Sequence, residues 1–178
     1  MRIDDTNPKP DCDVLVVGGG PAGSTVSALL AEKGWHVTLL EKDHHPRFHI
    51  GESLLPFNLP IFERLGVLDQ VHAIGIKKPG ADFNSGMEVS GHHQFHFSFA
   101  LDPSQPYAYE VKRSEFDHLL LRNSASKGTQ VIEGVRVTSV DFPKDGNPVA
   151  HAVDESGAGR TYTSRFFVDA SGRDTLLG

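Results

Sequence analysis

A run of apolar residues that leads directly into consecutive glycines constrains this chain more than any other feature. Residues 14–17 are apolar, and the glycines 18–20 follow them without a spacer. Residues 24–33 then favour a helix, and residues 36–40 form a second apolar run that ends at Glu41. The order of strand, glycine turn, helix, strand and acid predicts the βαβ unit that binds dinucleotides.

The glycines and the acid each have a physical reason for their positions. Gly18 permits the tight turn, Gly20 lets the backbone approach a pyrophosphate, and Gly23 lets the helix pack closely on the strand. The helix N-terminus attracts phosphates. The Glu41 carboxylate can accept hydrogen bonds from ribose hydroxyls, and its charge disfavours a 2′-phosphate. We therefore expect FAD or NAD rather than NADP, with these cofactor-binding residues: Gly18, Gly20, Pro21, Ala22, Gly23, Glu41 and Lys42.

Composition excludes several classes of protein. A length of 178 residues is enough for a domain with a core, and a net charge of −6 argues against a nucleic-acid partner. No apolar run approaches the roughly 20 residues of a membrane span. Residues 1–10 also lack the apolar segment of a secretory signal, so we expect a cytoplasmic protein. The single cysteine, Cys12, excludes an internal disulfide, and we expect it to pack in the core.

Sequence patterns around the βαβ unit predict the elements of the first two thirds of the chain. We expect residues 1–11 to form a disordered leader, residues 57–65 a short helix, and residues 67–80 a mixed connector. Apolar and polar residues alternate in residues 87–99, which predicts a strand that places on one face Phe95, Phe97 and Phe99.

The last third of the chain predicts one helix and several strands. Ser114 begins the helix, with Asp117 as its capping-box partner, and Gly128 ends it. The strand-like runs that follow predict a β-meander that leads into a final core strand and Asp169: residues 130–133 with 135–142, 149–154, and 161–168.

Three further segments resemble a known family. Residues 46–56, with the sequence PRFHIGESLLP, closely resemble the flavin-contacting loop of the flavin-dependent halogenases. Residues 110–117 resemble that family's pattern Gln-Val-x-Arg-x-x-Phe-Asp, with Glu110 in place of Gln. Residues 168–173 resemble a cofactor motif of the wider superfamily of FAD-dependent oxidoreductases with the two-dinucleotide fold. The resemblance covers nearly all of the chain after residue 11 and implies that FAD is also bound by Arg47, Gly51, Glu52, Ser53, Arg113, Asp169 and Gly172. From its place in this loop, Glu52 is a candidate buried acid near the flavin or, alternatively, a cap of the loop.

The candidate catalytic residue follows from the same resemblance. Residues 78–83, with the sequence KPGADF, resemble the setting in which halogenases place an active-site lysine, which implies that Lys78 is catalytic. The lysine would hydrogen-bond hypohalous acid or form a haloamine, and then direct the halogen to an electron-rich ring carbon. The register of the motif favours Lys78 over Lys77. From the residues alone, without the resemblance, the favoured interpretation of the two lysines is a solvated basic pair in a loop. The tryptophan that many halogenases have shortly after Phe83 is absent.

The resemblance implies the FAD-binding portion of a flavin-dependent halogenase of secondary metabolism. Its reduced FAD would come from a separate flavin reductase, its halide would be chloride or bromide, and its substrate an electron-rich aromatic, free or bound to a carrier protein. The alternatives are an aromatic monooxygenase, a geranylgeranyl-reductase-like enzyme, and a truncated flavin-binding module without turnover. A Trp-x-Trp-x-Ile-Pro motif beyond residue 178 would distinguish the halogenase.

The expected fold class is α/β: a Rossmann-like FAD-binding fold with a β-meander and part of a substrate-domain sheet. We expect no metal site, because strand alternation separates His93 from His92 and His96. We expect the following functional division of the chain: leader 1–11, βαβ unit and flavin-contacting loop 12–80, start of the substrate-domain sheet 81–110, and FAD-binding domain continued 111–178.

Overall fold

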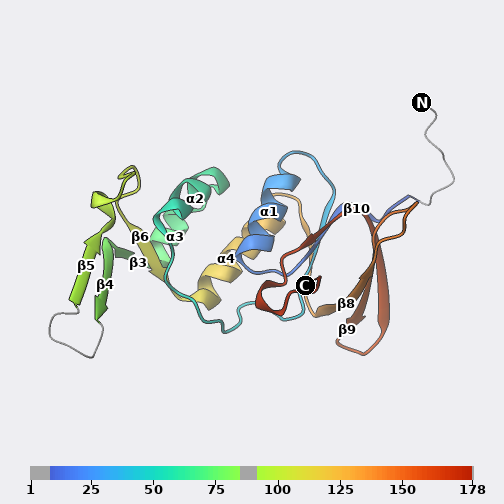
Figure 1. Cartoon of the computed structure of the whole chain (residues 1–178). Coiled ribbons are helices and arrows are strands. Elements are labelled where there is room, and N and C mark those ends of the chain that lie inside the picture. The colour runs from blue at the N-terminus through green and yellow to red at the C-terminus, as the bar shows by residue number, and fades with distance from the viewer. Residues whose placement is uncertain (1–8, 85–91, 178) are drawn as a thin grey trace. The chain divides into compact units, whose positions relative to one another are not determined.

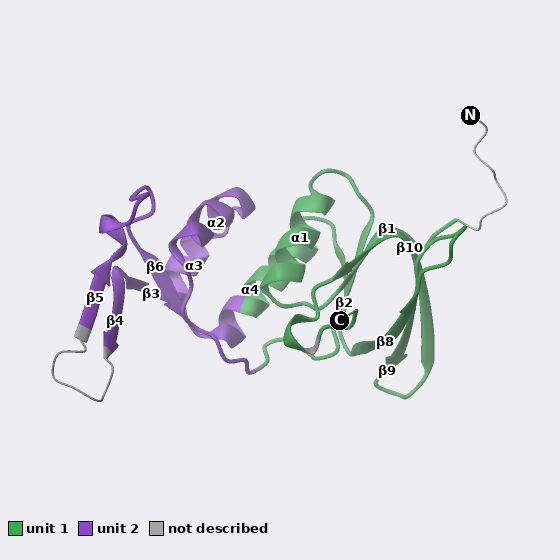
Figure 2. Ribbon diagram, viewed as in Figure 1, with its two compact units in different colours: residues 1–47, 117–178 green, residues 48–116 purple. Residues whose placement is uncertain are grey.

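The structure, a computed structural model, describes residues 9–84 and 92–177 (Figure 1). The chain divides into two compact units (Figure 2). Unit 1 comprises Met1–Arg47 and Asp117–Gly178, and unit 2 comprises Phe48–Phe116. These units are defined by compactness and not by function, so the functional division expected from the sequence stays a prediction.

Unit 1 is built on one six-stranded sheet whose strand order is β7-β2-β1-β10-β9-β8. β1, β2, β7 and part of β10 are parallel, whereas β8, β9 and the rest of β10 are antiparallel. The α/β class and the β-meander are therefore confirmed. The strands are β1 (Cys12–Val17), β2 (Val37–Leu40), β7 (Gln130–Ile132), β8 (Val135–Asp141), β9 (Val149–Asp154) and β10 (Gly159–Asp169).

β10 joins the two parts of this sheet. Its first half, Gly159 to Thr163, pairs antiparallel with β9. Its second half, from Ser164 to Asp169, pairs parallel with β1. The last strand of the meander and the final core strand are therefore one continuous strand, β10, which ends beside the carboxyl end of β1.

Both faces of β1 are covered, which explains why its sequence is apolar throughout. Val14 and Val16 pack with Leu121 of α4 (Arg113–Ser126) and with Leu30 of α1 (Pro21–Ala31). The alternate residues Leu15 and Val17 pack with the antiparallel strands, in a cluster that also contains Cys12, Val135, Val137, Ala150 and Ala152. The buried position of Cys12 confirms its expected packing role.

The ends of these elements correct two expectations. α4 begins at Arg113, so Ser114 lies inside the helix and does not cap it. Asp11 is not part of a disordered leader, because its backbone N–H and its carboxylate both bond to Thr163. Residues 1–8 of the expected leader lie outside the described residues.

Unit 2 combines a small helical core with two separate two-stranded sheets, β3–β6 and β4–β5. Phe62 packs edge-on against Phe116 with ring centroids 5.5 Å apart. The remaining buried residues include Leu59, Leu65 and Val71. The elements are η1 (Pro56–Asn58), α2 (Leu59–Leu65), α3 (Leu68–Ile74), β3 (Gly75–Lys78), β4 (Gly80–Asn84), β5 (His92–His96), η2 (Phe97–Phe99) and β6 (Ala108–Val111).

Two sequence predictions in unit 2 are wrong. The expected connector at residues 67–80 contains α3 and β3, neither of which has a strong pattern over its short length. The alternating strand at residues 87–99 ends at His96 and gives way to a 3₁₀ turn. Phe97 is therefore buried while Phe99 is 84% exposed, so they do not share a face. Residues 85–91 lie outside the described residues.

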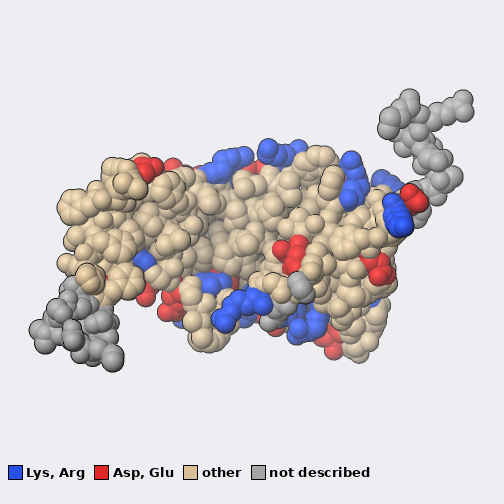
Figure 3. Space-filling view, in the orientation of Figure 1, with Lys and Arg blue, Asp and Glu red and all other residues tan. Residues whose placement is uncertain are grey.

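Charged side chains are dispersed over the face of the molecule shown in Figure 3, where basic and acidic residues form small groups separated by other residues. Within residues 9–84 and 92–177, no helix has both the length and the apolar character needed to cross a bilayer.

Candidate functional site

The glycine turn of unit 1 leaves no room for side chains at two positions. The Gly18 N–H donates to the Leu40 carbonyl at 2.8 Å, and Gly18 has φ of +105°. A Cβ on Gly18 would lie 2.3 Å from the Ala170 carbonyl oxygen, and one on Gly23 would lie 1.9 Å from the Gly18 oxygen. These two glycines therefore close the junction between β1, α1 and the end of β10, elements that are labelled in Figure 2.

Gly20, in contrast, faces open space. The heavy atom nearest to a Cβ placed there is Nη2 of Arg47, at 3.9 Å. Gly20 is also the N-cap of α1, it has no side-chain cap, and Pro21 follows it. The helix end thus offers N–H groups and a partial positive charge to an approaching phosphate.

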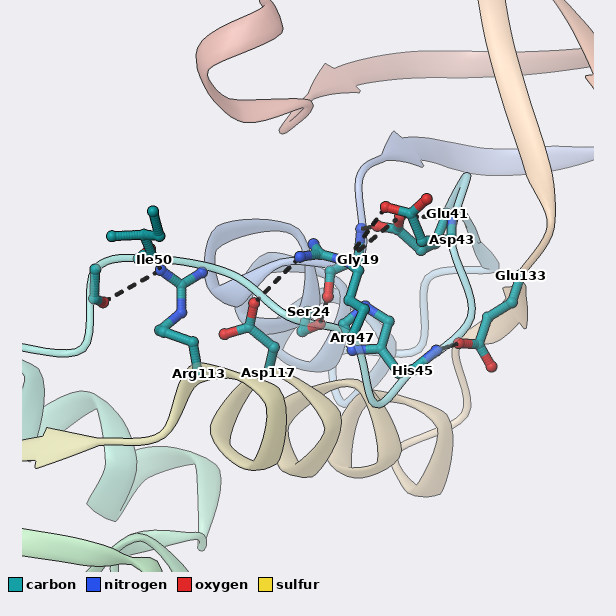
Figure 4. A network of polar contacts seen from close by, with 11 residues as sticks. Gly19, Ser24, Glu41, Asp43, His45, Arg47, Ile50, Arg113, Asp117 and Glu133 are labelled. Atoms are coloured by element: carbon teal, nitrogen blue, oxygen red, sulfur yellow. Dashed lines mark hydrogen bonds and ion pairs between the residues drawn. The ribbon is translucent and has the colours of Figure 1, made fainter.

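Glu41 lies at the end of β2 with its carboxylate directed at the glycine turn (Figure 4). One carboxylate oxygen accepts the Gly19 N–H at 2.5 Å, and the other accepts the Asp43 N–H at 2.9 Å. Only 3% of the side chain is exposed. A carboxylate has about four acceptor positions, and these two N–H groups use two of them.

Arg47 lies among three carboxylates (Figure 4). Its Nε is 3.8 Å from Glu41 and 3.6 Å from Asp43, and its Nη1 is 3.9 Å from the fully buried Asp117. Sequence reasoning proposed Arg47 but missed Asp43 and Asp117. Asp117 could have been found from the spacing of α4, because Leu120, Leu121 and Ser124 on the same helix are buried with it.

His45 adds an imidazole beside this network. Its backbone N–H donates to Glu133 at 2.6 Å. Burial, followed by the nearby charge of Arg47, lowers the pKa of His45 below its ordinary value. No described residue gives either ring nitrogen a hydrogen-bond partner. Burial and the Arg47 charge therefore both favour the uncharged form of this imidazole.

Asp169 shapes the loop that follows β10. Its carboxylate accepts hydrogen bonds from the N–H and hydroxyl of Ser171, at 3.0 and 2.6 Å, and from the N–H of Leu177 at 3.0 Å. Burial raises the pKa of Asp169, but these hydrogen bonds outweigh it and hold the pKa below its ordinary value. Gly172 follows in the left-handed region with φ of +81°. Asp169 and Gly172 thus determine the conformation of this loop, and their cofactor roles stay predictions.

The residues of unit 1 fit a dinucleotide. The uncapped helix end and the space at Gly20 suit the pyrophosphate, the Arg47 guanidinium borders that space, and the Glu41 carboxylate faces the glycine turn. Ala22 and Lys42 are exposed beside them.

In unit 2, the segment that resembles a flavin-contacting loop is held by backbone hydrogen bonds. Nη1 of Arg113 donates to the carbonyls of Ile50 and Gly51, at 3.0 and 3.3 Å. The Val111 N–H donates to the Glu52 carbonyl at 2.9 Å. The Glu52 side chain is exposed, so the expectation of a buried acid is wrong: its backbone, not its carboxylate, is used by the fold.

The structure brings Lys78 to this segment and takes Lys77 elsewhere. Nζ of Lys78 donates to Oγ of Ser53 and, at 3.1 Å, to the Leu54 carbonyl. Nζ of Lys77 lies 3.9 Å from the centre of the Tyr107 ring. Both lysines belong to β3 rather than to a loop. Within the described part of the chain, no three His, Cys, Asp or Glu side chains gather as a metal site would require.

Residues 11–177 match the FAD binding domain family. The chain therefore belongs to the FAD binding domain family, and its cofactor is FAD.

Two curated relatives are halogenases. The chain is 43% identical over 167 residues to a tryptophan 2-halogenase of Chondromyces crocatus, covering 92% of the chain and 31% of the relative. It is 34% identical over 185 residues to a 1H-pyrrole-2-carbonyl-[peptidyl-carrier protein] chlorinase of Pseudomonas fluorescens, covering 94% of the chain and 41% of the relative. The chain thus spans about a third of the length of such relatives.

Solved structures agree with the fold. The myxobacterial chondrochloren halogenase CndH superposes with a TM-score of 0.83 at 38% identity, over 92% of this chain and 38% of that one. A flavoprotein/dehydrogenase from Cytophaga hutchinsonii superposes with a TM-score of 0.82 at 37% identity, over 91% of this chain and 40% of that one. The predicted Rossmann-like FAD-binding fold is confirmed.

Proposed function

We propose that this chain is the FAD-binding portion of a flavin-dependent halogenase. The whole reaction would consume reduced FAD, O₂, a halide ion, a proton and an aromatic C–H. It would give oxidised FAD and an aryl halide, with both oxygen atoms leaving as water. The bound flavin supplies the activation of oxygen. The residues of the chain bind that flavin and guide the halogen to the substrate.

The observation that carries this proposal is the position of the Lys78 ammonium. It donates to Ser53 and Leu54, which belong to the segment that resembles the halogenase flavin-contacting loop. A solvated basic pair would have no reason to engage that segment. The register of β3 also separates the two lysines, because successive side chains of a strand point to opposite faces. Lys78 would hold the halogenating species by donating an N–H to it.

The substrate class follows from the relatives and from the chemistry. The printed names of two relatives include tryptophan and a carrier-bound pyrrole, both electron-rich heteroaromatics. An electrophilic halogen attacks such rings readily. We propose an indole, pyrrole or phenol substrate, free or carrier-bound, with chloride or bromide as the halide.

The proposed reaction also requires a partner and a compartment. A separate flavin reductase would supply the reduced FAD. The cytoplasm suits this exchange because it holds the reduced nicotinamide that such a reductase uses, and the buried Cys12 thiol is compatible with it.

Activity of the Lys78 variant tests the proposal. The protein that carries this chain is expressed at the full length of its reading frame and assayed with FAD, a flavin reductase, NADH and chloride or bromide. Indole, pyrrole and phenol substrates are offered, and products are read by their halogen isotope pattern. We expect Lys78→Met to lower halogenation at least about 100-fold while FAD binding stays intact.

Lys77→Met is the matched control, because Lys77 is the neighbour on the same strand and contacts Tyr107 instead. It should retain activity. Equal losses in the two variants would contradict the assignment of Lys78. Hydroxylated rather than halogenated products would contradict the halogenase.

A second candidate is an FAD-dependent oxidoreductase without halogenation. The flavoprotein/dehydrogenase structure favours it, because its superposition is nearly as good as that of the halogenase. Substrate-dependent NAD(P)H oxidation without any reductase, together with an unaffected Lys78→Met variant, would support this reading.

A further inference from the structure

The pairing of β3 with β6 divides their side chains between two faces. Lys78 lies opposite Ala108, and Ile76 lies opposite Glu110. On the other edge of β6, Ser53 forms an isolated bridge with Glu110. Because directly paired residues point to the same face of a sheet, Ser53 and Lys78 share one face.

The other face of this sheet is closed along β6, whereas Lys77 on β3 is exposed. Tyr109, Val111 and Leu54 are buried there or next to it, and the Tyr109 hydroxyl bonds to Nδ1 of His72 at 2.9 Å. Lys77 lies opposite Tyr109 and therefore belongs to this face. Only one of the two lysines can reach Ser53.

The segment around Ser53 is held along β6 by an isolated antiparallel bridge and two backbone hydrogen bonds. The Leu54 N–H donates to the Tyr109 carbonyl, and the Val111 N–H donates to the Glu52 carbonyl, both at 2.9 Å. Ala108, opposite Lys78, carries only a methyl group, so the lysine side chain can cross β6 and reach the Ser53 hydroxyl. Backbone pairing with β6 thus fixes the positions of β3, which carries the donor Lys78, and of the segment that carries the acceptor Ser53.

We propose that Ser53 is a positioning residue that holds the Lys78 ammonium in place for halogen transfer; this rests on the function proposed above. A lysine side chain has four flexible carbons, so an unrestrained ammonium would sample many positions. The Ser53 hydroxyl and the Leu54 carbonyl occupy two of its three N–H groups, and the Phe97 ring lies with its centre 5.7 Å from Nζ. The third N–H is left for the halogenating species.

Chemical labelling tests the contact without any need for catalysis. The full-length protein is treated with a limiting amount of an amine-acetylating reagent, and modification of Lys78 and Lys77 is counted by tandem mass spectrometry. In the wild type we expect Lys78 to react more slowly than Lys77, because its nitrogen must leave two acceptors before it can attack the reagent. Ser53→Ala should raise the Lys78 rate about fivefold, the size expected for the loss of one ordinary intramolecular hydrogen bond at an exposed site. The Lys77 rate should not change.

Two variants control for folding. Ser53→Thr keeps a hydroxyl and should restore the slow Lys78 rate. Ser98→Ala removes a hydroxyl from another exposed serine of unit 2, on η2, and should leave both lysine rates unchanged. Equal labelling of Lys78 in the wild type and in Ser53→Ala would overturn the contact.

The catalytic consequence is measured in the full-length protein as a ratio. Free hypohalous acid is captured with a small-molecule trap and compared with the halogenated substrate. Ser53→Ala should raise the ratio of trapped acid to product several-fold, since a wandering ammonium fails to retain the halogenating species, and Ser53→Thr should restore it. A purely structural role for Ser53 would lower both quantities together and leave the ratio unchanged.

The two proposals fail in different ways. If the wild-type protein forms neither product nor hypohalous acid, the halogenase function is wrong and the positioning role is overturned with it. If the wild type halogenates while Ser53→Ala leaves both the labelling rate and the ratio unchanged, only the positioning role is wrong.

Discussion

The two units of this chain bury apolar surface to very different degrees. In unit 1, Leu15, Val37 and Leu39 have no exposed surface, because both faces of the sheet are covered. In unit 2, Phe48 is 85% exposed and Ile76 is 75% exposed. Monomeric domains rarely expose large apolar side chains in contiguous patches. Unit 1 thus resembles a self-sufficient sheet domain, whereas unit 2 has a small helical core and an open sheet face that carries Lys78.

We expect the largest difference between the units in the stability lost when a glycine with a positive φ is replaced by alanine. Gly18 and Gly51 have φ of +105° and +102°. A Cβ on Gly18 would meet a carbonyl at 2.3 Å, whereas one on Gly51 would meet only the end of the Arg113 side chain at 3.2 Å. We expect Gly18→Ala to destabilise by about 4 kcal/mol, from backbone strain and overpacking combined, and Gly51→Ala by about 1 kcal/mol. Urea unfolding gives both values.

Gly128→Ala separates the two contributions to the Gly18 effect. Gly128 has the same φ of +105° but no atom within 4 Å of an added Cβ. It should cost about 1 kcal/mol from strain alone. If Gly18→Ala cost no more than Gly128→Ala, the close approach of Ala170 would not be a constraint, and the closed junction of unit 1 would be disproved.

Acid sensitivity should also differ between the units. In unit 1, a hydrogen bond from the Ser156 hydroxyl is the main cause that lowers the pKa of Asp154 from 3.8 to about 2. Burial opposes this shift, and further hydrogen bonds from Ala158, Arg160 and the Ser156 N–H add to it. Because the folded-state pKa is depressed, this carboxylate stabilises the fold fully above about pH 4, and the contribution is lost as the pH falls through about 2. Asp154→Asn should therefore lower the urea midpoint at pH 7 and reduce its further decline between pH 4 and pH 2.

Asp102 in unit 2 is the matched comparison. The Ser104 backbone N–H, together with its hydroxyl, lowers the pKa of Asp102 as well. Asp102 joins no two strands, whereas Asp154 lies at the hairpin between β9 and β10 and pairs with Arg160 at 3.0 Å. Asp102→Asn should shift the midpoint less than Asp154→Asn at pH 7. A larger shift for Asp102→Asn would mean that unit 2 limits the stability of the chain.

The smallest effect is expected on the open face of β3. Ile76→Thr should change stability by no more than about 0.5 kcal/mol, because the side chain is mostly in solvent. Val111→Thr, on the closed face of the same sheet and 2% exposed, should cost about 1.5 kcal/mol, because it buries a hydroxyl. Chemical denaturation of the two variants measures both. A cost at Ile76 equal to that at Val111 would show that the open face is covered in solution.

The sequence predicted unit 1 better than unit 2 for a physical reason. The βαβ unit combines continuous apolar strands with a glycine turn, and each signal supports the other, so β1, α1 and β2 were all expected. β3 has only four residues and includes two lysines, so it has no apolar pattern to detect. Its identity as a strand depends on pairing with β6, which lies some thirty residues further along the chain.

The candidate site divides in the same way. The dinucleotide residues Gly18, Gly20 and Glu41 were predicted from local spacing, and the structure places them together at the carboxyl ends of β1 and β2. The contact between Lys78 and Ser53 joins residues that are 25 positions apart, and nothing in either local segment encodes it. Sequence resemblance suggested that both residues matter, but only the strand register shows that they meet.

Adjacent lysines on β3 also give this strand a form of redundancy. Successive side chains of a strand point to opposite faces of the sheet. If one residue were inserted or deleted before Gly75, and the pairing of β3 with β6 shifted by one position, Lys78 would point away from Ser53. The same shift would turn Lys77 toward it, because the two lysines are consecutive. The strand would therefore still place a primary amine on that face. A register shift of one residue usually abolishes a site, but here it would replace one lysine by the other.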